Sequence, residues 1–160
     1  MPALAMLIEA LEGAAAEYEV VEHPRTETAR AEAHALGLPA DDVAKTLVVK
    51  TPEGYLRVVL PASRSLDLRR LRGVVGGGHD TRLATEEDLA REYPEFELGA
   101  VPPFGGVRDD RVLVDRRVAE RDRVVFEAGD HAHSIRLPAA DLLRVAGDPE
   151  VADVCVPPED

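Results

Sequence analysis

The stretch Lys45-Thr46-Leu47-Val48-Val49-Lys50 holds the only two lysines among the 19 basic residues of the chain. Its β-branched and aliphatic centre predicts a β-strand. Side chains alternate along a strand, so Lys45 shares a face with Leu47 and Val49, while Lys50 points to the other face. The two lysines therefore cannot form one paired site. Lys50 is interpreted as a solvated charge at a strand end, whereas Lys45 is either such a charge or a functional ammonium.

The lysine strand is expected to form a hairpin with residues 55–60, because Pro52-Glu53-Gly54 is a turn sequence. Apolar residues at helical spacing and capping residues predict helices on both sides of this hairpin. The expected helices are 3–16, 28–36, 66–71, 85–93 and 139–145, and the other expected strands are 18–22, 112–115, 124–127 and 133–137. The segment after Gly147 is expected to pack loosely. Short helices interleaved with hairpin-like strands predict an α+β fold with a mixed, curved sheet.

Composition limits the classes of protein that this chain can belong to. Its 160 residues suit one domain, residues 1–160. The net charge of −12 argues against broad capture of nucleic acid, which needs clustered basic residues, but leaves a small local basic site open. The single cysteine excludes an intramolecular disulfide and fits a reducing cytoplasm. No signal peptide or membrane role is expected, because residues 1–11 lack basic residues and no apolar run approaches about 20 residues.

The loop Gly99-Ala100-Val101-Pro102-Pro103-Phe104-Gly105-Gly106 is the most unusual local sequence. Its two adjacent prolines fix the backbone and remove two N–H donors. The remaining N–H groups of Gly99, Ala100 and Val101 could point together at one oxygen, as in an oxyanion hole. An ordinary turn between a helix and a strand is the alternative.

The sequence His131-Ala132-His133 places two imidazoles on one face of a predicted strand. Such a pair can bind zinc, but a catalytic zinc needs a third protein ligand, and no other histidine has a recognisable spacing. Histidines that line a pocket or are partly buried are the alternative, with Ser134 on the opposite face. Cys155 is not expected to be a nucleophile, since it lies in a polar tail. The chain also lacks the Gly-x-Ser-x-Gly motif of many serine hydrolases and the P-loop lysine after Gly76-Gly77-Gly78.

Taken in order, these segments resemble the YbaK/prolyl-tRNA synthetase editing-domain superfamily of aminoacyl-tRNA deacylases. The resemblance covers about residues 20–145, and its specific core is the Lys-Thr-Leu strand and the Gly-x-x-x-Pro loop. The segments that carry it are His23-Pro24, Leu36-Gly37, Val43-Ala44-Lys45-Thr46-Leu47-Val48-Val49, Val59-Leu60-Pro61, Leu66-Asp67-Leu68, Gly99 to Gly105, Ala128-Gly129 and Ser134-Ile135-Arg136-Leu137.

The resemblance implies a single-domain, mixed, barrel-like sheet surrounded by short helices. It implies hydrolysis of the ester between a wrong amino acid and tRNA, most often tRNA for proline, without a metal or cofactor. Lys45 would hold the terminal adenosine through phosphate, backbone N–H groups at Gly99 and Ala100 would stabilise the ester carbonyl, and a ribose hydroxyl of the substrate would help to activate water. The residues expected to contact the substrate are His23, Thr26, Val101, Pro102, Pro103, Phe104, His131, His133 and Ser134.

Two segments depart from the pattern of bacterial cysteinyl-tRNA(Pro) deacylases, namely residues 93–98 and the strand at His131 to Ser134. Both are expected to border the pocket, so the amino acid removed stays open among Cys, Ala, Ser, Thr and others. The acidic chain predicts a modest or local affinity for the acceptor end of tRNA, or help from an aminoacyl-tRNA synthetase. A non-catalytic module that binds an aminoacyl or nucleotide ligand is the alternative function, and a zinc hydrolase using His131 and His133 is a third.

Overall fold

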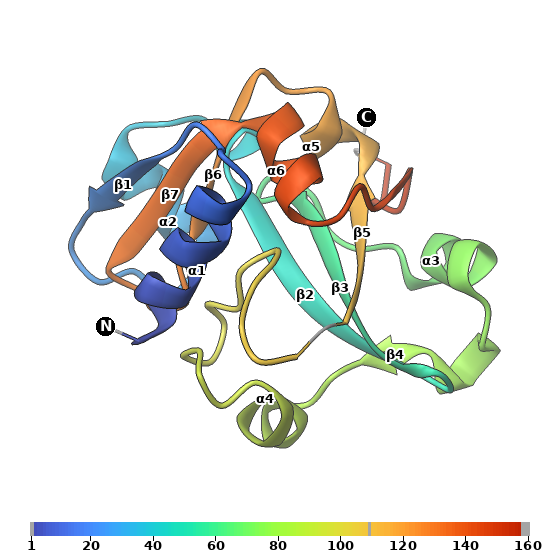
Figure 1. Cartoon of the computed structure of the whole chain (residues 1–160). Coiled ribbons are helices and arrows are strands. Elements are labelled where there is room, and N and C mark those ends of the chain that lie inside the picture. The colour runs from blue at the N-terminus through green and yellow to red at the C-terminus, as the bar shows by residue number, and fades with distance from the viewer. Residues whose placement is uncertain (1, 109, 158–160) are drawn as a thin grey trace.

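The structure is a computed structural model that describes residues 2–108 and 110–157, and it places the lysine strand in a five-stranded sheet (Figure 1). The strands occur in the order β4-β2-β3-β5-β8. They are β2 (Ala44–Thr51), β3 (Gly54–Pro61), β4 (Arg82–Leu83), β5 (Arg111–Asp115) and β8 (Glu150–Ala152).

The predicted hairpin is confirmed, because β2 pairs antiparallel with β3 and places Lys45 opposite Leu60 and Lys50 opposite Tyr55. The other pairings make the sheet mixed, since β2 is antiparallel to β4 while β3–β5 and β5–β8 are parallel. Parallel neighbours need long connections, and short helices supply part of them. The predicted α+β class with a mixed sheet is therefore confirmed.

The remaining strands form a second sheet, in the order β1-β7-β6 and antiparallel throughout. They are β1 (Glu19–Glu22), β6 (Arg123–Glu127) and β7 (His133–Pro138). An isolated parallel bridge between Val43 and Val125 links the two sheets at the start of β2. The strands of the described residues thus form two linked sheets, and no continuous ladder closes them into one barrel.

The described residues form six α-helices around the two sheets, and α1 lies against the β1-β7-β6 sheet (Figure 1). Capping supports the predicted boundaries: Thr28 accepts a hydrogen bond from the N–H of Ala31, and Gly37 ends the same helix at φ 67°. None of the helices in the described residues has the length and apolar character needed to cross a membrane. The helices are α1 (Pro2–Gly13), α2 (Ala29–Leu36), α3 (Leu68–Val75), α4 (Glu86–Glu92), α5 (Arg116–Ala119) and α6 (Ala139–Val145).

Within residues 148–157 the C-terminal segment packs against the sheet, so the prediction of a loose tail is wrong for this part, and residues 158–160 lie outside the described residues. β8 pairs with β5, and Val154 and Cys155 are fully buried in the core beneath the five-stranded sheet. Burial raises the pKa of the Cys155 thiol to about 12, and Asp115 adds to this shift. A thiol with so high a pKa is a poor nucleophile near neutral pH. The sequence analysis placed Cys155 in a polar tail, whereas it lies in the core.

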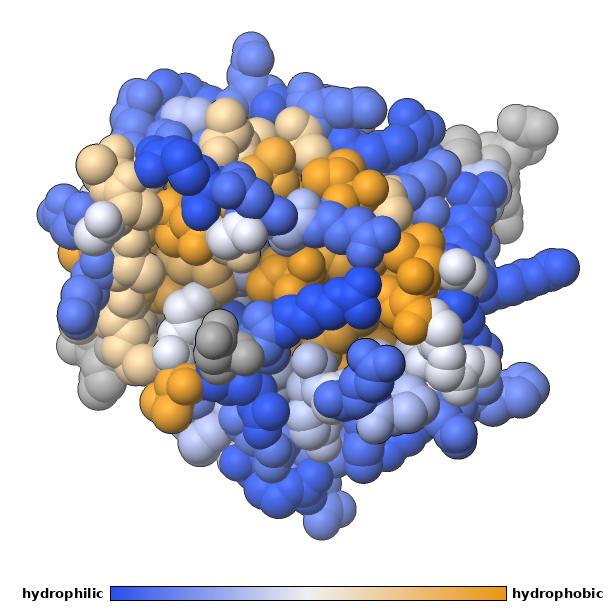
Figure 2. Space-filling view, turned by 45° about the vertical axis from the view of Figure 1, so that its right-hand side comes forward, coloured by the Kyte–Doolittle hydropathy of each residue, from blue (hydrophilic) through white to orange (hydrophobic). Residues whose placement is uncertain are grey.

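Hydrophobic side chains also reach the surface. Figure 2 shows them gathered in a band across one face of the molecule, with hydrophilic side chains on both sides. Leu83 and Leu98 are among the large apolar side chains that stay exposed, at 45% and 46%. Leu83 also forms part of the wall of a cavity at the edge of β2.

Candidate functional site

A cavity with a volume of about 250 Å³ lies at the edge of β2. β4 pairs only with Val49 and Lys50, so the first half of β2 has no partner strand on that side among the described residues. Elements distant in sequence close this open edge: helix α2, the end of β6, helix α4 and the Gly99 loop. The lining residues are Ala29, Glu32, Ala44, Lys45, Thr46, Leu47, Val48, Leu83, Ala84, Leu89, Gly99, Val101, Phe126 and Glu127.

Lys45 supplies the positive charge of this cavity, and its side chain is half-buried. Burial lowers the pKa of its ammonium, and the nearby charge of Arg30, on helix α2, lowers it further. An anion bound at Lys45 would relieve the repulsion between these two positive charges. A phosphate is the anion that a compact ammonium binds well. Lys50 does not line the cavity.

The Gly99 loop brings backbone donors to the same cavity. Gly99 has φ 82°, and a side chain at this position would come within 3.5 Å of the His131 ring. The N–H groups of Gly99 and Val101 have no hydrogen-bond partner among the described residues, and both residues line the cavity. The N–H of Ala100 instead donates to the carbonyl of Glu97 at 3.0 Å. The predicted trio of donors is therefore corrected to a pair, because a turn already uses the Ala100 donor.

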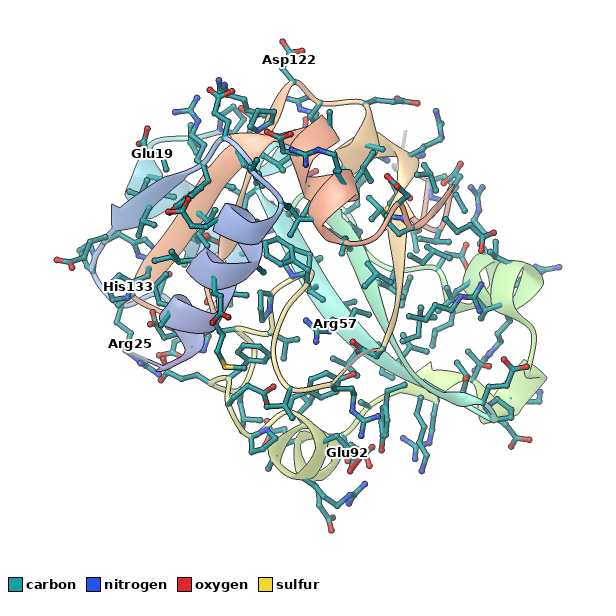
Figure 3. The ribbon with its side chains drawn as sticks, viewed as in Figure 1. Glu19, Arg25, Arg57, Glu92, Asp122 and His133 are labelled. Atoms are coloured by element: carbon teal, nitrogen blue, oxygen red, sulfur yellow. The ribbon has the colours of Figure 1, made fainter. Side chains whose placement is uncertain are left out.

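Arg57 of β3 anchors this loop from the centre of the molecule (Figure 3). Its guanidinium is 1% exposed and donates to the carbonyls of Pro102, at 2.9 Å, and Gly105, at 2.6 Å. Its Nε donates to the buried carboxylate of Asp110 at 3.0 Å. The ring of Tyr93 lies 5.3 Å from the guanidinium carbon. A planar fork suits this task, since it binds several acceptors in fixed directions.

A buried glutamate, Glu32 of helix α2, is also among the residues around the cavity and has no exposed surface. Ser134 donates to its Oε2 at 2.5 Å, and His23 Nε2 lies 2.8 Å from the same hydroxyl oxygen. Its Oε1 has no hydrogen-bond partner among the described residues. Burial raises the pKa of Glu32 to about 8, and the neighbouring charge of Glu127 adds to this effect. The predicted site residues His23 and Ser134 therefore lie behind the wall and fix Glu32.

A second buried glutamate, Glu127 at the end of β6, also lines the cavity and is 7% exposed. Its Oε2 lies 2.7 Å from Nδ1 of His131, but the two atoms are not aligned for a hydrogen bond, and neither has another partner among the described residues. The other ring nitrogen of His131 donates to the Leu98 carbonyl at 2.7 Å. Burial raises the pKa of Glu127 to about 8, and Glu27 is the next cause. His131 thus contacts both Glu127 and the Gly99 loop.

Sequence reasoning missed the two glutamates that we call the acid pair, Glu32 and Glu127. One signal for Glu32 was present, because it lies on the helix face formed by Ala29, Ala33 and Leu36, where a carboxylate is unexpected. No comparable signal marked Glu127 at the end of its strand. A glutamate on an apolar helix face is buried only with partners or in its protonated form.

The other predicted site residues lie outside the cavity wall. His133 contacts Asp130 at 3.0 Å and lies near the edge of the molecule (Figure 3). Strand β7 begins at His133, so the prediction that both histidines lie on one strand is wrong. No group of three or more His, Cys, Asp and Glu side chains in the described residues is placed to hold a metal ion. The remaining predicted residues, all buried and outside the wall, are Thr26, Pro102, Pro103 and Phe104.

The raised pKa of Glu32 predicts a pH dependence of stability. Its ordinary value is 4.5 and its folded value is about 8, so between these values the folded chain holds a proton that the unfolded chain has lost. Stability from this group is therefore lost as the pH rises from about 4.5 to about 8. Ser134, Glu127 and His131 are the groups that influence Glu32, and only Ser134 and His131 favour its charged form.

Glu32→Gln should therefore raise the melting temperature more at pH 8 than at pH 5, because glutamine mimics the protonated acid. The expected gain is about 2–4 °C for each kcal/mol of stabilisation. Thermal unfolding followed by circular dichroism at both pH values measures it. Glu9→Gln, on the exposed face of α1, is the control and should show no such difference. Equal shifts at both pH values would mean that Glu32 is ionised in the folded protein.

Comparison with known proteins gives one matching family. Residues 23–145 match the sequence model of the family described as aminoacyl-tRNA editing domain. The chain is 30% identical over 135 residues to a proline–tRNA ligase of Xanthomonas campestris pv. campestris (strain 8004), which covers 84% of this chain and 23% of the ligase. The chain thus spans about a quarter of the length of that relative.

A smaller relative matches over almost the whole chain. The multifunctional Ser/Thr-tRNA deacylase ProXp-y of Escherichia coli (strain K12) is 29% identical over 152 residues, which are 92% of this chain and 89% of the deacylase. Among solved structures, a candidate trans-editing enzyme for prolyl tRNA synthetase aligns with a TM-score of 0.85 and 27% identity. That alignment covers 98% of this chain and 99% of the other.

Proposed function

The chain belongs to the aminoacyl-tRNA editing domain family, and from this premise we propose that it is a deacylase that hydrolyses mischarged aminoacyl-tRNA in trans. The observation that carries the proposal is the cavity at the open edge of β2, which Lys45, Gly99 and Val101 line together. The N–H groups of Gly99 and Val101 have no partner among the described residues. This arrangement can hold an anion and a polarised carbonyl at once. The similarity to a free-standing deacylase over most of both chains supports action in trans.

Lys45 is proposed to bind a phosphate at the terminal adenosine, so that the ester enters the cavity. The N–H groups of Gly99 and Val101 would then donate to the ester carbonyl oxygen and stabilise the negative charge that develops on it. Water adds to the carbonyl carbon, the bond to the ribose oxygen breaks, and the amino acid and the tRNA leave. An aminoacyl ester is already reactive, so positioning and charge stabilisation can suffice without a protein nucleophile.

Water activation is proposed to come from a ribose hydroxyl of the substrate. The buried Cys155 does not suit a nucleophilic role, because its pKa is raised to about 12. No metal or other cofactor is part of this proposal. The proposed substrate also fits the acidic composition, because a net charge of −12 argues against a long basic surface and leaves recognition to a local cation, Lys45.

A synthetase partner is a further part of the proposal. The relative in Xanthomonas campestris is a proline–tRNA ligase, and the matching segment is a minor part of it. This similarity supports the proposal that the chain acts together with a proline–tRNA ligase, with mischarged tRNA as the molecule that both proteins bind. The cytoplasmic location predicted from composition belongs to the same proposal.

A panel of mischarged tRNAs tests the proposed function. The protein is incubated with tRNAs carrying Cys, Ala, Ser, Thr or Pro, including tRNA for proline, and release of the amino acid is followed over time. Hydrolysis of at least one mischarged species above the uncatalysed rate is expected. Binding of an aminoacyl-adenosine analogue without hydrolysis of any tRNA would instead indicate the alternative function, a non-catalytic binding module.

Gly99→Ala should lower the rate of deacylation about 10-fold or more, because a residue with a Cβ disfavours φ 82° and the backbone that carries the donors would shift to relieve this strain. The expected loss of stability is about 1–2 kcal/mol. Single-turnover deacylation and urea unfolding measure the two effects.

Gly37→Ala is the matched control for this substitution. Gly37 has φ 67° at the end of α2, a Cβ at this position would meet no atom within 4 Å, and the residue does not line the cavity. The Gly37→Ala variant should therefore lose about as much stability as Gly99→Ala and keep its deacylation activity. Equal activity in the two variants would mean that the Gly99 backbone takes no part in the reaction.

A further inference from the structure

We propose that the acid pair, Glu32 and Glu127, selects aminoacyl groups whose side chain carries a hydrogen-bond donor such as a hydroxyl. This inference rests on the proposed function and concerns its specificity. It assigns the recognition of the amino acid to two carboxyl groups inside the cavity, apart from the lysine and the loop that hold the ester.

The first observation is that each acid has a buried carboxyl oxygen with no hydrogen-bond partner among the described residues. Both residues line the cavity. Glu32 Oε1 is buried and unpartnered among the described residues, whereas Glu127 Oε2 is buried and has only His131 Nδ1 beside it, at 2.7 Å without a hydrogen bond. A buried acceptor without a partner is unfavourable, so a ligand that donates to it gains affinity over one that cannot. Such groups make a site reject an analogue that lacks the donor.

The second observation is that Glu32 is held in place before any ligand binds. Its Oε2 accepts from Ser134, whose oxygen also contacts His23, and these three residues come from α2, β7 and the segment after β1. The carboxyl group therefore cannot rotate freely to satisfy Oε1 elsewhere. A fixed acceptor loses little entropy when it binds a donor, which favours selectivity.

The third observation is the character of the remaining wall. Apart from the acid pair, Lys45 and Thr46, the lining side chains are apolar or absent. A small aminoacyl side chain would thus meet apolar atoms on most sides and the two acids at fixed points. Raised pKa values of about 8 for both acids support this picture, because a neutral carboxyl group can accept from a hydroxyl and also donate to it.

The backbone loop indicates which part of the substrate reaches the acids. Glu127 lies 2.7 Å from His131, and His131 is the residue that a Gly99 side chain would touch. An ester held by the Gly99 and Val101 donors would therefore have its amino acid beside the acid pair. The α-ammonium is common to all aminoacyl groups, so only a comparison of side chains separates the proposed role from binding of the ammonium.

Calorimetry with adenosine analogues that carry an amide in place of the ester provides the test, because these analogues bind without turnover. The seryl analogue is compared with the alanyl analogue, and the threonyl analogue with the valyl analogue, which has nearly the same shape. The unaltered protein should bind the hydroxyl-bearing member of a pair about 10-fold more tightly. Glu32→Leu should bring this ratio to about one, and Glu32→Gln should retain part of it because the amide oxygen still accepts.

Glu9→Gln is the matched control and should leave the ratio unchanged, and Glu127→Leu repeats the test if Glu32→Leu does not fold. A ratio of one in the unaltered protein would overturn the inference, as would an equal loss of affinity for both members of each pair in Glu32→Leu. The latter result would assign the acids to the α-ammonium. If the protein hydrolyses mischarged tRNA but binds both analogues of a pair equally, the proposed specificity is refuted and the proposed function stands. If it prefers the hydroxyl-bearing analogue about 10-fold but hydrolyses no tRNA, the proposed function is refuted and the specificity stands.

Discussion

Lys45→Ala is expected to lower kcat/KM for deacylation about 10- to 150-fold. This range corresponds to the loss of one hydrogen bond to a charged group, about 1.5–3 kcal/mol. Lys45 lines the cavity and supplies its positive charge, so its loss removes the proposed phosphate contact and leaves the ester free to bind in unproductive positions. The measurement uses the mischarged tRNA that the unaltered protein hydrolyses fastest.

Lys50→Ala is the matched control, because Lys50 lies on the same strand and outside the cavity wall. It should change kcat/KM less than about twofold. Lys45→Arg is the sharper variant: a guanidinium keeps the charge but is broader and binds in fixed directions, so activity should fall in a half-buried position that fits an ammonium. Full activity in Lys45→Ala would remove Lys45 from the mechanism, and full activity in Lys45→Arg would show that only the charge matters.

The alternation of side chains along a strand was enough to predict that Lys45 and Lys50 point to different faces. The sequence did not show that Lys45 lines a cavity, because that cavity forms at the open edge of the sheet. Strand β2 and its partner β3 followed from local patterns, and so did helices α2 and α4 with their caps. The two-residue strand β4 has too few residues to leave a periodic signal. Yet this short strand leaves the first half of β2 open, and the cavity forms there.

The candidate site was predictable only where a residue type is unusual for its surroundings. The lysine in an arginine-rich chain and the diproline loop were such features. Glu32 and Glu127 come from a helix and a strand that meet only in the folded chain, and burial of their carboxyl groups depends on Ser134 and His131 from other segments. The Ala100 N–H was predicted to be free because the sequence from Glu97 to Ala100 has no signal that distinguishes a hydrogen-bonded turn from another loop. In the structure this N–H donates to the Glu97 carbonyl.

Arg57 illustrates the same difficulty, since within its strand it reads as an ordinary charged residue, yet it is buried and holds the loop. Arg57→Ala is expected to destabilise the fold by about 3–5 kcal/mol, because it leaves the carboxylate of Asp110 buried without its cationic partner. The carbonyls of Pro102 and Gly105 lose their donors as well. Urea unfolding measures the change, with deacylation assayed at a temperature where the variant is folded.

Arg108→Ala is the matched control for Arg57→Ala. Arg108 lies 5.6 Å from the same Tyr93 ring and pairs with Glu92, but its side chain is 32% exposed. A partly solvated pair contributes less than about 1 kcal/mol, so this variant should unfold close to the unaltered protein. If Arg57→Ala lowers the free energy of unfolding as little as Arg108→Ala does, then water takes the place of the guanidinium beside Asp110. The Arg57→Ala variant could instead be destabilised while its folded form keeps full activity. In that case the backbone at Gly99 keeps its conformation without Arg57, and the proposed donors do not depend on the contacts of Arg57 with Pro102 and Gly105.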